Sequence, residues 1–138
     1  MTIIIAYRKF INTDITRELH LPVDADNHRL GTELATLDGV TYVSLPDGAT
    51  PPTEQPEEIS ASIAVVTLTS EQIAAIKAVS PHVRLINSRV ADQIAAEYSL
   101  DDEIKLLRTA PSAEFEAYNA HAEACRAWGR AEKAKLGL

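Results

Sequence analysis

The chain has 138 residues, of which 46% are hydrophobic and 24% charged, and it carries a formal net charge of −7. This composition is typical of a globular protein, and the acidic excess argues against a nucleic-acid partner, because phosphate contacts need clustered Lys and Arg. The single cysteine, Cys125, excludes an intrachain disulfide and predicts a reducing compartment.

The N-terminal region, residues 1–45, is predicted to be β-rich. Residues 2–11 are rich in β-branched and aromatic side chains, and residues 15–23 partly alternate apolar with polar positions, which predicts two strands. The apolar start at residues 3–6 is too short for a signal peptide or a membrane helix. The sequence therefore predicts a soluble, cytoplasmic protein without a membrane partner.

The sharpest turn signal is Asp38-Gly39, which separates the strand-like residues 33–37 from residues 40–45. An Asp-Gly pair between two such runs favours a two-residue type I′ turn, since both of its central positions need a positive φ. We therefore expect a β-hairpin here.

Residues 46–58 are predicted to be an extended, solvated linker. Proline fixes φ and lacks a backbone donor, so a proline-rich segment is excluded from the interior of helices and sheets. A ligand for another protein's aromatic groove is the less favoured alternative. The linker contains four prolines: Pro46, Pro51, Pro52 and Pro56.

The third region, residues 59–138, is expected to open with a strand or an extended strap over residues 59–68.

About four helices are predicted after that strand. Thr69 and Gln72 have the spacing of a capping box, which starts the first helix. Pro81 suits the first position of the second helix. That second helix carries an amphipathic stripe at intervals of three and four: Val83, Ile86, Val90, Ile94 and Tyr98.

Two further helices are indicated by serine caps. Ser99 and Ser112 each precede an acidic first turn, and each run closes with basic residues, which suits the helix dipole. The helix after Ser99 is expected to turn Leu100, Ile104 and Leu107 inward. The helix after Ser112 carries a narrow apolar seam suited to packing against another helix: Phe115, Tyr118, Ala122, Cys125 and Trp128 or Gly129.

The expected fold class is therefore α+β. It combines a small N-terminal antiparallel β region, a Pro-rich linker and a C-terminal helical region of about four helices. The predicted boundaries are residues 1–45, 46–58 and 59–138.

Two groups of residues are candidate metal ligands, but neither group is predicted to bind a metal ion. Asp24, Asp26 and His28 stand at alternate positions like the start of a calcium loop, but the glycine and the closing acidic residue of that motif are missing. His121 and Cys125 would share one helix face, yet two ligands are too few for a structural zinc site. We therefore predict no metal and no cofactor.

The sequence also indicates no catalytic constellation. The acidic run at residues 101–103 lies in the first turn of a helix, where its charges complement the helix dipole. The chain has no Gly-x-Ser-x-Gly elbow, and its five glycines are too scattered for a phosphate loop. We therefore expect a protein that is not an enzyme.

Candidate partner-binding residues lie on the last helix. Arg and Trp are typical interface anchors, which points to Arg126, Trp128 and Arg130, together with Phe115 and Tyr118. The aromatic side chains could equally belong to the core, because a lone Trp is usually buried in one way or the other.

The chain also resembles the small proteins encoded in the tail modules of bacteriophages and prophages. The runs that carry the resemblance are "SPHVRLIN", "YSLDDEIKLLR" and "EFEAYNAHAEACRAWGRAEKAKLGL", with "LPDGATPP" as a looser match. The resemblance implies a tail-fibre assembly chaperone in the host cytoplasm, which binds a tail fibre protein and shields it until it trimerises. Exposed edge strands or the helical seam would supply the contact.

Two alternatives remain at this stage. One is a structural virion tail component that forms a homo-oligomer through the C-terminal helices. The weaker one is an inhibitor of a host system or a small enzyme. An enzyme should show a pocket with perturbed titratable groups, whereas a structural protein should show a symmetric or flat apolar interface.

Overall fold

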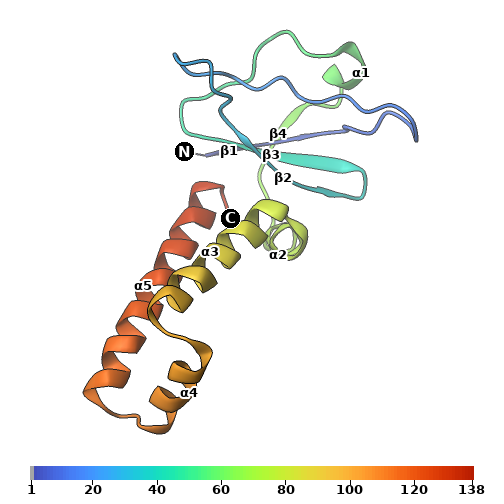
Figure 1. The fold of residues 1–138 in the computed structure, drawn as a ribbon. Helices are drawn as coiled ribbons and strands as arrows, with labels where there is room; N and C mark the ends of the chain where they lie inside the picture. The colour runs from blue at the N-terminus through green and yellow to red at the C-terminus, as the bar shows by residue number, and fades with distance from the viewer. Residues whose placement is uncertain (1) are drawn as a thin grey trace. The chain divides into compact units, whose positions relative to one another are not determined.

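The computed structural model describes residues 2–138, which form a four-stranded antiparallel sheet followed by helices (Figure 1). The predicted α+β class is confirmed. The sheet has the order β2-β3-β1-β4, so β2 and β4 are its edges. The elements in chain order are β1 (Ile3–Tyr7), β2 (Thr32–Leu37), β3 (Val40–Leu45), α1 (Glu57–Ser60), β4 (Ala64–Val66), α2 (Ser70–Val79), α3 (Pro81–Glu97), α4 (Leu100–Arg108) and α5 (Ala113–Lys135).

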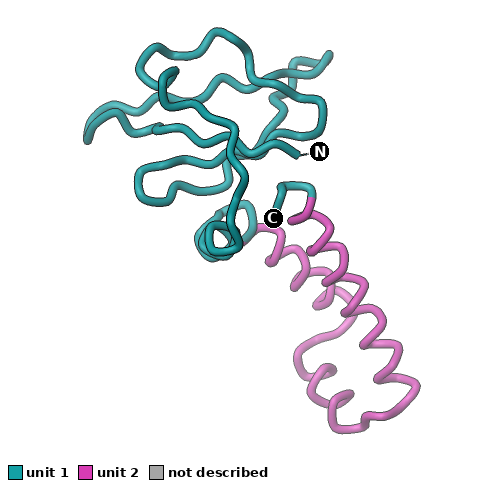
Figure 2. The backbone as a smooth tube through the Cα atoms, turned by 180° about the vertical axis from the view of Figure 1, so that it is seen from behind, with its two compact units in different colours: residues 1–83, 135–138 teal, residues 84–134 magenta. Residues whose placement is uncertain are grey.

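The described residues divide into two compact units (Figure 2). Unit 1 runs to Val83 and includes Lys135–Leu138, and unit 2 comprises Arg84–Ala134. The division falls within the first turn of α3, and the Pro-rich segment 46–58 lies wholly inside unit 1. Each unit has its own hydrophobic core.

The core of unit 1 lies on one face of its sheet. Ile5 and Tyr7 of β1 share this face with Val43 and Leu45 of β3, because alternate residues of a strand point the same way. Leu19, from the chain between β1 and β2, packs onto them. On the sheet's other side, α2 packs against β2, and the Gln72 amide donates to the Tyr42 hydroxyl at 3.4 Å.

The hairpin prediction is confirmed. β2 and β3 pair in antiparallel fashion, and both turn residues have the positive φ that the turn requires, 50° for Asp38 and 79° for Gly39. Thr36 and Thr41, which face each other across the hairpin, join their hydroxyls at 2.8 Å.

The prediction of a strand over residues 15–23 is wrong. The segment forms isolated bridges, Phe10 with Thr16 and Val23 with Arg29. Its backbone forms hydrogen bonds with side chains in place of a neighbouring strand: the His20 amide donates to the Gln55 side chain at 2.8 Å. The alternation of apolar and polar residues has another cause: the segment covers the core of unit 1 and inserts Leu19 into it. This packing requires no pairing with a strand.

Most of the Pro-rich segment 46–58 is exposed, as predicted, but the segment does not separate two domains, because it lies wholly within unit 1. Ala49 is buried in the core of unit 1, together with Ile59 of α1, the one-turn helix that begins at the end of the segment. The Gln55 amide donates to the carbonyls of His20 and Pro52, both at 3.0 Å. Proline keeps the segment out of the sheet, while the buried Ala49 and the hydrogen bonds of Gln55 hold it against the rest of unit 1.

The predicted helix starts are confirmed. The capping box at α2 is complete: the Gln72 amide donates to the Thr69 hydroxyl at 3.1 Å, and the Thr69 amide donates to the Gln72 side chain at 2.9 Å. Ser99 forms a similar box with Asp102 at α4. The Ser112 hydroxyl accepts from the Phe115 amide at 3.0 Å at the start of α5.

Unit 2 consists of α3 and α5 packed side by side, with α4 between them in sequence (Figure 2). Its buried core contains Ile94, Tyr118, Ala122 and Cys125, so the predicted seam of α5 is confirmed. α3 and α5 approach closely at Gly129, where an added Cβ would lie 2.6 Å from a methyl carbon of Val90.

The predicted orientation of α4 is wrong. Leu100, Ile104 and Leu107 are 71%, 42% and 60% exposed, while Leu106 on another side of the helix packs against the unit 2 core. Leu106 packs against the unit 2 core together with Tyr98, which follows α3, and Phe115 of α5. The apolar stripe of α4 faces away.

Among residues 2–138, no helix combines the length and the apolar composition needed to cross a membrane.

Candidate functional site

The aromatic residues predicted to bind a partner lie mainly in the core of unit 2. Tyr118 is 8% exposed, and its ring stands edge-on to that of Tyr98 with centroids 5.0 Å apart. Phe115 is half-buried against the same cluster, and Trp128 is half-buried on α5. Burial favours the core alternative for Phe115 and Tyr118.

The two predicted arginines line a shallow cavity of about 240 Å³ in unit 2. Arg126, Arg130 and Lys133 approach it from α5, and Asn87 lines it from α3. Arg130 also donates to the Glu123 carboxylate, and this hydrogen bond lowers the pKa of Glu123. The cavity is therefore cationic at its rim, with one of its charges already paired.

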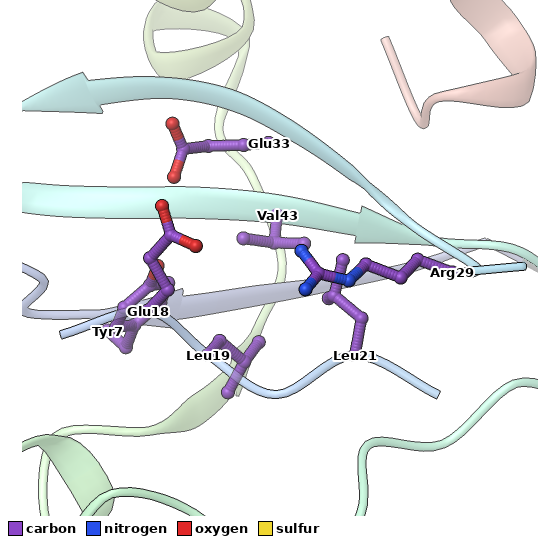
Figure 3. Close-up of a pocket in the computed structure, with 7 residues that line it drawn as sticks. All are labelled: Tyr7, Glu18, Leu19, Leu21, Arg29, Glu33 and Val43. Carbon is purple, nitrogen blue, oxygen red and sulfur yellow. The ribbon is translucent and has the colours of Figure 1, made fainter. Parts of the chain in front are cut away.

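A second cavity, of about 210 Å³, lies in unit 1 (Figure 3). The carboxylates of Glu18 and Glu33 and the guanidinium of Arg29 point toward a common space. Its lining comprises Tyr7, Glu18, Leu19, Leu21, Arg29, Glu33 and Val43.

One titratable group of this cavity, Tyr7, and one beside it, Lys9, have raised pKa values. Burial raises the pKa of the Tyr7 phenol, so the hydroxyl stays protonated. The hydrogen bond from Lys9 to Glu33, 2.9 Å between Nζ and Oε1, raises the pKa of Lys9. The cavity can offer carboxylate and guanidinium groups to a small ligand.

The two potential metal groups have structural partners. Asp24 accepts from the amides of Asp26 and His28 at 2.9 Å each, so its carboxylate shapes this exposed turn. Ligand atoms of the three residues lie within 4.8 Å of one another. As predicted, His121 and Cys125 face the same side of α5, with Nε2 3.6 Å from Sγ.

The β4 edge, defined as Ala64, Val65 and Val66, is the most open part of the sheet. Ala64 and Val65 are exposed, Val65 by 73%, and Val66 is half-buried. The start of the strand is anchored by Ser62, whose hydroxyl accepts from the Arg8 amide at 3.0 Å. The sequence contains no Asp, Glu, Lys or Arg from residue 59 to residue 70.

The β2 edge differs from the β4 edge in three respects. It carries a charged residue, Glu33, which pairs with Lys9. Its register shifts between Glu33 and Ala35, and α2 packs against it. Charges, bulges and covering helices are the devices that protect edge strands from pairing with other chains. β4 relies on its short length instead, so it is the edge where an extended segment could be added.

Two apolar surfaces were thus not located by sequence reasoning, the β4 edge and the exposed stripe of α4. The run over residues 59–70, which has no charged side chain, was a signal for the first, because 24% of the residues in the whole chain are charged. The α4 stripe was visible as a spacing pattern, but spacing does not tell which way an amphipathic helix faces.

Comparison with protein-family models, with curated proteins and with solved structures finds no match to this chain.

Proposed function

We propose that this chain is a non-enzymatic assembly factor that binds a bacteriophage tail fibre protein, and that the β4 edge is its fibre-binding site. The partner is suggested by the resemblance of the C-terminal residue runs to phage tail-module proteins. The observation that carries the site is the contrast between the two sheet edges: β2 is charged, bulged and packed by α2, whereas β4 is uncharged and exposed.

An edge of this kind binds by strand addition. An extended partner segment pairs its backbone with the free side of β4, and main-chain hydrogen bonds supply the affinity. Val65 then gains an apolar neighbour from the partner, which removes most of its exposed surface from water. A newly made fibre chain whose own strands are still unpaired offers such a segment, and the bound state prevents it from pairing with the wrong chain.

The test is co-expression of the fibre protein with wild-type chain and with Val65→Lys. A lysine on an edge strand opposes strand addition, so we expect Val65→Lys to reduce fibre binding at least about tenfold and to lower the yield of trimeric fibre. Val79→Lys is the matched control, since Val79 is an exposed valine of the same unit that lies on α2. Equal thermal melts of the two variants would show that both remain folded.

Equal fibre binding by both lysine variants would exclude the β4 edge as the site. Failure of the wild-type chain to bind the fibre at all would overturn the proposed function itself.

Mass spectrometry of induced lysate and purified virions separates the proposal from its main alternative. An assembly factor should be found with the fibre in the lysate and be absent from virions. Stoichiometric presence in virions would replace the proposal with a structural tail component.

A further inference from the structure

The exposed stripe of α4 consists of Leu100, Ile104 and Leu107. Their spacing of four and three residues places them on one face of the helix. They are 71%, 42% and 60% exposed, while Leu106 takes the contact with the unit 2 core. A helix of nine residues that leaves three large aliphatic side chains in water is better suited to a partner than to solvent.

The charges beside this stripe are ordered along the helix. At about 100° per residue, Asp101 and Arg108 fall on the same side of the stripe, the first at the start of the helix and the second at its end. Glu103 falls on the other side and is half-buried. One rim of the stripe is thus acidic at one end and basic at the other.

We propose that α4 is a self-association surface, on which the α4 helices of two copies of this chain pack antiparallel about a two-fold axis. This arrangement brings Leu100 against Leu107 of the second copy, with Ile104 next to its own counterpart near the axis. It also places Asp101 opposite Arg108, twice by symmetry, and opposes the two helix dipoles. A parallel two-fold pairing would instead place Asp101 on the same rim as Glu103 of the second copy, where like charges repel.

The charge pattern favours a second copy over an unrelated partner because the stripe is complementary to itself. The same geometry brings the two Glu103 side chains near each other on the opposite rim, where like charges weaken the association. The contact surface of one short helix is small, and interfaces below about 1,200 Å² are weak and transient. We therefore expect a concentration-dependent dimer.

The first experiment is sedimentation equilibrium of the full chain from about 10 μM to 1 mM. The wild type should dimerise within this range. Ile104→Asp should raise the dissociation constant at least about tenfold, because it introduces a charge at the centre of the interface. Leu85→Asp is the matched control, since Leu85 is an exposed leucine of unit 2 on α3, and this variant should dimerise like the wild type. A wild-type chain that stays monomeric throughout overturns the proposal, whether or not it binds a fibre.

Charge variants test the antiparallel geometry. Asp101→Arg and Arg108→Asp should each associate at least about tenfold more weakly than the wild type, because each creates two like-charge pairs. An equimolar mixture of the two should recover association, since the heterodimer contains two opposite-charge pairs. Glu103→Gln should strengthen the dimer. If mixing gives no recovery while each variant keeps its helical circular dichroism, the antiparallel arrangement is wrong.

Cysteine cross-linking gives an independent readout. Under mild oxidation, Ile104→Cys should form a disulfide with its own counterpart. Leu100→Cys should link with Leu107→Cys but not with itself, because two copies of residue 100 would lie about 10 Å apart along the axis, beyond disulfide reach. The wild type serves as the control for the buried native Cys125. Efficient self-linking of Leu100→Cys would overturn the proposal in favour of a parallel pair.

Discussion

The two units of the molecule bury their side chains in different ways. Among residues 2–138, the large side chains that are less than 2% exposed all lie in unit 1, and they include Tyr7, Leu34 and Leu45. In unit 2 the most deeply buried residue is a small one, Ala122, and its tyrosine and isoleucine side chains keep more contact with solvent. A sheet with material on both faces encloses its side chains, whereas a pair of helices encloses a narrow seam.

This difference predicts unequal stability. Buried apolar area is the main favourable term in folding, so unit 1 should unfold at higher denaturant than unit 2. Trp128, the single tryptophan, lies in unit 2 and reports the unfolding of that unit by fluorescence. Hydrogen exchange measures the amides of unit 1 separately.

The largest expected effect comes from Leu34→Ala in unit 1. Leu34 is fully buried on β2, and truncating a buried leucine leaves a cavity that costs about 2–5 kcal/mol of unfolding free energy. We expect amide protection in β2 and β3 to fall by this amount, while the fluorescence transition of Trp128 shifts little. The matched variant Ile94→Ala, in the core of unit 2, should shift the Trp128 transition instead.

If both variants lowered the unfolding free energy equally by amide exchange in unit 1 and by Trp128 fluorescence in unit 2, the predicted difference between the units would be wrong. The two units would then unfold as one cooperative body, and a single free energy of unfolding would describe the chain.

A smaller effect on the stability of unit 2 is expected from Gly129→Ala in the α3–α5 seam, and its sign should depend on the residue at position 90. A Cβ at this position would lie 2.6 Å from Cγ2 of Val90, a branched side chain with little rotamer freedom. Overpacking costs about 1–3 kcal/mol, against about 1 kcal/mol gained in helix propensity. Gly129→Ala should therefore destabilise unit 2 in the wild-type background.

In a Val90→Ala background the clash is removed, so Gly129→Ala should become stabilising by up to about 1 kcal/mol. A double-mutant cycle with Trp128 fluorescence measures the coupling. Additive effects of the two substitutions would show that α3 and α5 are not in close contact at this point.

Local chemistry made much of the fold predictable from sequence. The turn at Asp38-Gly39 and the caps at Thr69 and Ser99 depend on residues close in sequence, and all of them form as expected. The buried faces of α3 and α5 could be predicted from the spacing of their apolar residues, because these two faces pack against each other. In each case the pattern had one low-energy solution.

Other features depended on contacts between distant residues. Leu19 and Ala49 belong to segments expected to be a strand and a linker, and both are part of the unit 1 core. The orientation of α4 depends on the contact that Leu106 makes with the unit 2 core, which spacing along the helix does not specify. Likewise, the open edge at β4 follows from the strand order, which no single segment specifies.

The smallest predicted effect is an alkaline loss of stability in unit 1 that depends on Tyr7. Burial raises the pKa of its phenol in the folded chain above the value of about 10 in the unfolded chain. Above pH 10 the folded state therefore binds more protons at this group than the unfolded state does, and the unfolding free energy falls as pH rises. The contribution is fully present at neutral pH and is lost as pH passes through the folded pKa.

Tyr7→Phe should flatten this alkaline decline while lowering stability at neutral pH by about 1 kcal/mol, because the hydroxyl loses its backbone hydrogen bond at Leu19. Lys9 needs its own control, since the hydrogen bond to Glu33 raises its pKa and produces a loss of the same sign in the same pH range. Lys9→Met removes that contribution and leaves the one from Tyr7. Urea unfolding of the three proteins at neutral and alkaline pH, followed by circular dichroism of the sheet, separates the two groups. An unchanged alkaline slope in Tyr7→Phe would mean that the phenol is open to solvent, and the tight packing assigned to unit 1 would fail at its largest buried side chain.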